Sequence, residues 1–183
     1  MKKERNIALA VCAVLAALIL LLTSQSSPLY PINLWGDANC LFTVGRVMKD
    51  GGVLYRDIYE QKGPLLYLIH ALAACLSDTS FWGVYIMEAL AMTVALYAAY
   101  RLMRLRAGMG FSLGAAAFFG AAFASCTAFI RGDSAEEFCL PLLMAALAIA
   151  YAEYGRRAKP MRMKRLFVCG VLAGCIATIK YTL

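Results

Sequence analysis

The sequence has little charge and few side chains suited to metal binding. Only 16% of its 183 residues are charged, whereas 62% are hydrophobic, and the mean hydropathy is +0.68. It has one histidine, His70, and its seven cysteines include no CxxC pair and give an odd count. These features argue against a soluble enzyme domain and against a disulfide framework or cysteine-based metal site. The cysteines are therefore interpreted as small apolar residues.

The net charge of +7 does not indicate a nucleic-acid partner. The lysines and arginines occur in short clusters that flank apolar segments, which is a pattern of membrane topology and not of a binding face. The sequence therefore predicts a protein that contacts the lipid bilayer and no nucleic acid.

Long apolar runs predict the fold class. Five of them are close to the length that crosses a membrane core of about 30 Å. They cover residues 7–22, 81–102, 111–130, 138–154 and 166–183. A sixth run, 64–76, would reach only about 20 Å as a helix, so it is expected at the interface. We predict an all-α, polytopic helical membrane protein with about five transmembrane helices plus juxtamembrane helices on its outer surface.

The basic clusters predict the orientation. If residues 64–76 do not span, the clusters at 2–5, 101–106 and 156–165 all face the cytoplasm, as the positive-inside bias requires. The first span lacks an A-x-A cleavage pattern, so it is expected to remain in the protein. This topology predicts a plasma-membrane protein with a cytoplasmic N-terminus and outer loops at 23–80 and 131–137.

The first outer loop concentrates charged residues of both signs between two apolar segments. Within it, residues 38–50 have helical apolar spacing, and Gly63-Pro64 is expected to start a second interfacial helix at 64–76. Asp37 precedes the first helix, where a helix N-cap is the structural alternative to a catalytic role. Lys62 precedes the second, where it would attract a phosphate or extend to lipid headgroups.

The second outer loop, Arg131 to Glu137, contains three carboxylates. Asp133 and Glu136 are spaced to share one helical face and approach an external site, although a solvated loop is the simpler interpretation. Glu88 and Lys180 fall in the outer halves of two spans, where an unpaired charge is costly. His70 is expected to contact lipid headgroups.

The order of these motifs resembles the GT-C superfamily of integral membrane glycosyltransferases, which includes protein mannosyltransferases and aminoarabinose transferases. The resemblance rests on WGD at 35–37, YRD at 55–57, KGPLLY at 62–67 and RGDSAEE at 131–137. It is closest to bacterial members that use polyprenyl-phosphate sugars in cell-envelope assembly. Their outer loops follow a first span in the same order.

The resemblance implies inverting transfer of a sugar from a polyprenyl-phosphate carrier to a hydroxyl of a glycan, lipid or protein acceptor. Asp37 is then the catalytic base, and Lys62 with Arg56 binds the lipid phosphate. Asp133 and Glu136 form the second acidic motif, and Asp57 and Glu60 support the site. Some members bind a divalent cation and others do not, so no cofactor is assigned and the metal is left unknown.

Family members usually have eight or more spans, and this sequence ends within an apolar run. We therefore expect the chain to be the N-terminal part of a longer enzyme, and the isolated fragment need not be active. Two alternatives stay open. One is a transporter or flippase for a lipid-linked sugar, and the other is a non-catalytic membrane fragment or accessory subunit.

Overall fold

The protein is all-helical, as predicted. The computed structural model describes residues 2–154 and 162–181, which contain seven helices and no strand. The helices are α1 (Lys2–Thr23), α2 (Gly36–Lys49), α3 (Pro64–Leu76), α4 (Trp82–Met103), α5 (Met109–Ala124), α6 (Ala135–Tyr154) and α7 (Met163–Ile179).

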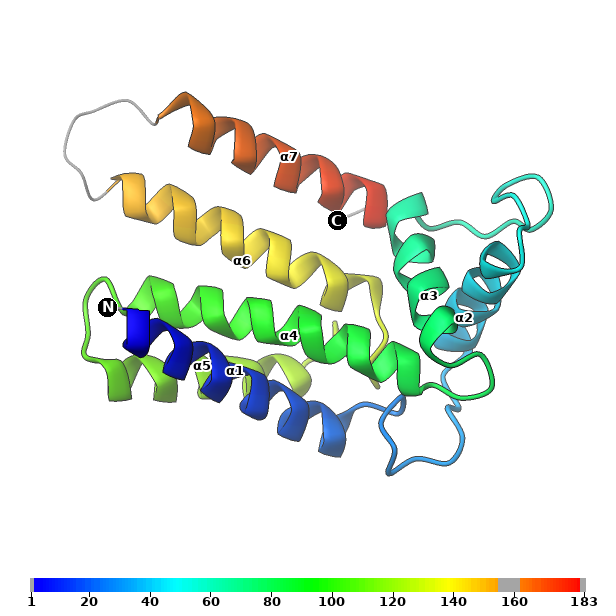
Figure 1. Cartoon of the computed structure of the whole chain (residues 1–183), viewed down its shortest axis with the longest axis horizontal. Helices are drawn as coiled ribbons and strands as arrows, with labels where there is room; N and C mark the ends of the chain where they lie inside the picture. The colour runs from blue at the N-terminus through cyan, green and yellow to red at the C-terminus, as the bar shows by residue number, and fades with distance from the viewer. Residues whose placement is uncertain (1, 155–161, 182–183) are drawn as a thin grey trace.

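Five helices form a bundle, and the two short ones cover one end of it. Helices α1, α4, α5, α6 and α7 run back and forth, whereas α3 lies across their ends with α2 beside it (Figure 1). We call this the cap end. The opposite end contains the start of α1, the last turn of α4 with Arg101, and the turn between α4 and α5 with Arg104 and Arg106, and we call it the basic end.

Among the residues that the structure describes, three helices are long and apolar enough to cross a membrane: α1, α4 and residues Ala135–Glu153 of α6. Helices α5 and α7 have only 16 and 17 residues, so the predicted count of about five spans is not confirmed. The span predicted at residues 111–130 extends beyond the end of the helix found there. Helix α5 ends at Ala124, where Ser125 donates its hydroxyl to the carbonyl of Ala121, and the following turn runs to residue 134.

Both short helices occur where the sequence predicts them. Helix α3 matches residues 64–76 because Pro64 occupies its first turn and Gly63 caps it in extended geometry. Helix α2 begins slightly before the predicted residue 38, so Asp37 lies in its first turn and is not its N-cap. The cap position belongs to Trp35, which makes no side-chain cap hydrogen bond.

Helix α3 is packed into the protein and is more than a surface helix. Leu66, Tyr67, His70 and Ala73 are almost fully buried, because α2 covers one side of α3 and the bundle covers another. Glycines allow this close approach. A Cβ at Gly83 of α4 would lie 1.9 Å from the carbonyl oxygen of Ala73.

We expect Gly83→Ala to destabilise the protein by about 1–3 kcal/mol, because the added methyl group forces α3 away from α4. Gly114→Ala is the matched control, since a Cβ at this helical glycine meets nothing within 4 Å. Thermal unfolding in detergent compares them. Equal melting temperatures for both variants would contradict the close α3–α4 packing.

Candidate functional site

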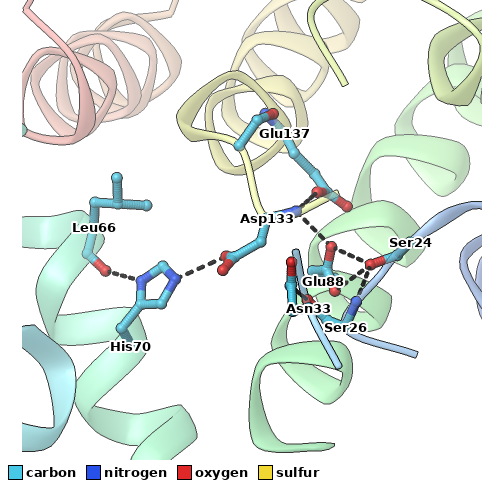
Figure 2. A network of polar contacts seen from close by, with 9 residues as sticks. Ser24, Ser26, Asn33, Leu66, His70, Glu88, Asp133 and Glu137 are labelled. Carbon is cyan, nitrogen blue, oxygen red and sulfur yellow. Dashed lines mark hydrogen bonds and ion pairs between the residues drawn. The ribbon is translucent and has the colours of Figure 1, made fainter. Parts of the chain in front are cut away.

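Four ionisable side chains lie buried together where α3 meets the bundle (Figure 2). His70 comes from α3, Glu88 from α4 and Glu137 from the first turn of α6, while Asp133 lies in the turn before α6. Each exposes at most 1% of its surface. We call these four residues the buried network.

His70 connects α3 to this network. Its Nδ1 lies 2.8 Å from the carbonyl oxygen of Leu66, and its Nε2 lies 2.7 Å from Oδ1 of Asp133. A carbonyl only accepts hydrogen bonds, so Nδ1 carries a proton. The contact between Nε2 and Asp133 therefore holds a second proton between ring and carboxylate. Burial lowers the pKa of His70, but Asp133, the Leu66 carbonyl and Glu88 together raise the pKa above its usual value.

The backbone of Asp133 connects the other two carboxyl groups. Its N–H donates to Oε1 of Glu88 at 2.7 Å and to Oε2 of Glu137 at 3.0 Å. Glu88 also accepts from the hydroxyl of Ser24, at 2.9 Å. One N–H therefore links α4 to α6, and Ser24 joins the end of α1 to the same point.

An unusual backbone turn places Asp133 in this position. Three of its residues have positive φ: Ile130 at 57°, Gly132 at 86° and Asp133 at 55°. Such values are rare for a β-branched residue, although aspartate tolerates them better. A Cβ at Gly132 would lie 2.6 Å from Oε1 of Glu88, so only glycine permits this approach.

The buried network is closed to solvent and incompletely paired. Oδ2 of Asp133 and Oε1 of Glu137 are buried without a hydrogen-bond partner among the described residues. Among the residues that the structure describes, no group of three or more histidine, cysteine or acidic side chains has a metal-binding arrangement. Because no solvent reaches it, the network acts here by fixing α3 against α4 and α6.

The pKa of His70 predicts a pH dependence of stability. Because this pKa is raised on folding, the protonated ring stabilises the folded state fully below its unfolded value of about 6.5. The stabilisation is lost as pH rises through the folded pKa. We expect the melting temperature in detergent to fall over this higher range, and to fall less in His70→Gln. Identical pH profiles would contradict this assignment.

Lys62 lies at the start of α3, at the cap end, and its backbone is held from both sides. Its N–H donates to Oε2 of Glu60 at 3.0 Å and to the hydroxyl of Tyr67 at 2.8 Å, and its carbonyl accepts from the hydroxyl of Tyr55 at 2.8 Å. Gly63 then donates its N–H to the carbonyl of Ile179, at 3.0 Å. Lys62 is thereby positioned against the end of α7.

Lys62 lines a cavity of about 110 Å³ together with Gln61, Lys180 and Tyr181. Lys180 also forms an ion pair with Glu136. Two lysines thus border one small cavity, and a carboxylate forms an ion pair with only one of them among the described residues. We call this the lysine cavity.

Glu60 supports the loop before Lys62. Its carboxylate accepts the hydroxyl of Tyr67 as well as the Lys62 N–H. Burial raises the pKa of Glu60, but these hydrogen bonds favour the charged form and lower the pKa below its usual value. Burial and the neighbouring Glu60 raise the pKa of Tyr67, so its hydroxyl keeps its proton.

The structure does not bring the other predicted site residues together with Lys62 in one site. Arg56 forms a two-point ion pair with Asp57, at 2.9 and 2.8 Å, on the exposed surface. Asp37 is exposed, and among the described residues no hydrogen bond, ion pair or cavity joins it to Lys62. Asp133 and Glu136 do not share a helical face, because Asp133 precedes α6 and contacts His70 while Glu136 contacts Lys180.

Sequence reasoning missed the buried network as a unit. It assigned His70 to lipid headgroups, yet His70 is 1% exposed and bonded to Asp133. One feature of the sequence pointed to the network: a charged Glu88 within an apolar span is energetically costly unless it has a partner. The partner could not be named, because Glu88 and Asp133 are separated by 45 residues.

Among the described residues, three helices long and apolar enough to cross a membrane give the chain the character of a helical membrane protein. Comparison with known proteins adds no relative: no family model, no curated protein and no solved structure matches the chain. Arginines 156 and 157 and Lys159, which belong to a predicted cytoplasmic cluster, lie outside the described residues.

Proposed function

We propose that the chain is part of a GT-C-type glycosyltransferase that transfers a sugar from a polyprenyl-phosphate carrier to an acceptor hydroxyl at the outer face of the membrane. The lysine cavity is the observation that carries this proposal. Lys62 and Lys180 border one cavity at the cap end, where a departing phosphate would meet an excess of positive charge, because Glu136 pairs with Lys180 and not with Lys62.

The residues supply the chemistry as follows. The acceptor hydroxyl attacks the anomeric carbon and loses its proton to the carboxylate of Asp37. The bond between that carbon and the phosphate oxygen breaks, and the polyprenyl phosphate leaves with both bonding electrons. Lys62 stabilises the charge that collects on the phosphate, and Glu136 holds Lys180 beside it.

In this proposal Asp37 acts on the acceptor hydroxyl and Lys62 acts on the phosphate of the donor. Substrate binding therefore has to bring the acceptor hydroxyl to the anomeric carbon of the donor. The exposed position of Asp37 in the first turn of α2 leaves its carboxylate accessible to an acceptor. Arg56 forms an ion pair with Asp57, and this ion pair lowers the pKa of the Asp57 carboxyl group. Arg56 therefore assists only if the phosphate displaces Asp57.

We expect Asp37→Asn to lower sugar transfer at least about a hundredfold, because a general base contributes at least that factor. The assay uses the complete gene product in lipid vesicles, with a radiolabelled polyprenyl-phosphate sugar and an acceptor glycan. Asp50→Asn is the matched control, since Asp50 lies at the other end of α2 with a side chain 70% exposed.

Unchanged transfer in Asp37→Asn would remove Asp37 from the site. Movement of the intact donor across the membrane, without cleavage of its sugar–phosphate bond, would support a lipid-linked-sugar transporter in place of a transferase. The labelled sugar distinguishes these results, because only transfer places it in the acceptor.

A further inference from the structure

The basic end of the bundle contains two cavities that share a wall. One cavity, of about 340 Å³, lies between α1 and α4 and is lined by charged and phenolic side chains. The other is an apolar groove of about 660 Å³ between α4, α6 and α7. Tyr97 and Arg101 line both. We call them the polar cavity and the apolar groove.

The polar cavity has a large excess of positive charge. Its cations are Lys2, Arg5, Arg101 and Arg104, and among the described residues its only carboxylate is Glu4. Glu4 is already engaged, because it accepts from Nε of Arg104 at 2.8 Å and from the hydroxyl of Tyr100 at 3.1 Å. Among the described residues, the other three cations have no carboxylate partner.

Arg101 is held at the boundary between the cavities. Its guanidinium carbon lies 5.9 Å from the centre of the Tyr97 ring, which limits where the side chain can point. Arg165 lines the groove, but its charge is balanced by an ion pair with the buried Glu153. Arg101 is therefore the cation that adds net positive charge to the groove.

The apolar groove has the length of a lipid chain segment. Along α4 it extends from Val94 to Leu105, which corresponds to about 16 Å of helix. This is close to half of a membrane core of about 30 Å, the depth of one leaflet. Its other lining residues are mainly alanine, valine and isoleucine, including Ala98, Ala148 and Val168.

We propose that the basic end binds an anionic phospholipid of the adjacent leaflet, with its phosphate in the polar cavity and one acyl chain in the apolar groove. Charge complementarity selects the headgroup, because a zwitterionic lipid would bring a cation to a cavity that already has an excess of them. A soluble anion would leave the groove empty, whereas a phospholipid fills both cavities. The positive-inside bias identifies this leaflet as the cytoplasmic one.

Native mass spectrometry of the full chain in detergent tests the proposal. The protein is titrated with phosphatidylglycerol and, separately, with phosphatidylcholine that has the same acyl chains. We expect saturable binding of phosphatidylglycerol at least about fivefold tighter than that of phosphatidylcholine, the factor that one basic side chain near an anionic lipid typically gives. Equal affinities would overturn the proposal.

Three variants locate the site. Arg101→Gln is expected to remove most of the preference for phosphatidylglycerol. Arg106→Gln is the matched control, because it removes the same charge nearby but lines neither cavity, as Arg106 packs over the Tyr151 ring. Ala148→Phe fills the groove and is expected to weaken both lipids.

Equal losses in Arg101→Gln and Arg106→Gln would show general attraction to the basic end and overturn the assigned site. Displacement of phosphatidylglycerol by a polyprenyl phosphate at tenfold lower concentration would also overturn it, because the occupant would then be the sugar carrier. Lipid binding is measured without sugar transfer, so failure here and failure of the proposed transferase are separate results.

Discussion

Replacement of Lys62 by alanine is expected to lower sugar transfer about a hundredfold while the protein remains folded. An electrostatic donor at a developing charge typically contributes about 3 kcal/mol to lowering the barrier. Lys62 lines the lysine cavity and has no ion-pair partner among the described residues, so its removal breaks no ion pair. The loss should appear in initial rates of labelled sugar transfer in vesicles.

Lys49→Ala is the matched control for this experiment. Lys49 lies at the end of α2 and pairs with Asp78 at 2.7 Å, away from the lysine cavity. Lys62→Arg keeps the positive charge with a different shape and is expected to retain part of the rate. Full activity of Lys62→Ala would remove Lys62 from the proposed site, and equal losses in both alanine variants would indicate a general effect of charge.

Replacement of Asp133 by alanine is expected to destabilise the folded protein by about 3–5 kcal/mol, the usual cost of removing one partner of a buried pair. His70 would remain buried without its carboxylate, and alanine would also be strained at the positive φ of this position. Unfolding in detergent measures the change. Helix α3 should lose its attachment to the bundle first.

Two further variants separate the causes. Asp133→Asn tolerates the same backbone conformation without the charge, so its cost isolates the electrostatic part. The double variant Asp133→Ala with His70→Ala should be less unstable than the sum of the two single changes, because neither partner is then left unpaired. Additive losses would show that the two residues do not stabilise each other. Glu136→Ala should cost much less, since its pair with Lys180 is partly exposed.

The Lys62 region was the more predictable part of the candidate site. Lys62, Gly63 and Pro64 are adjacent in sequence, and a helix start is a local event that proline and glycine specify. The partner across the lysine cavity was not predictable in the same way. Lys180 is more than one hundred residues away, and only the packing of α7 against α3 brings it to Lys62.

The sequence by itself determined the helices and their apolar character. Apolar runs of fixed length and the turn signals around residues 51–52 and 63–64 depend only on neighbouring residues, so the predicted helices at 38–50 and 64–76 and the long apolar helices were found. Local signals did not fix how many of these helices span, since α5 ends earlier than its apolar run.

Only the tertiary structure decided which charged residues meet. His70, Glu88, Asp133 and Glu137 belong to different elements, and their contacts depend on how α3 crosses the end of the bundle. It also separated Asp133 from Glu136, which the spacing of three residues had suggested were neighbours on a helix. The physical reason is that burial of a charge requires a partner but does not specify it, whereas the close approaches at Gly83 and Gly132 bring α3, α4 and the turn before α6 together.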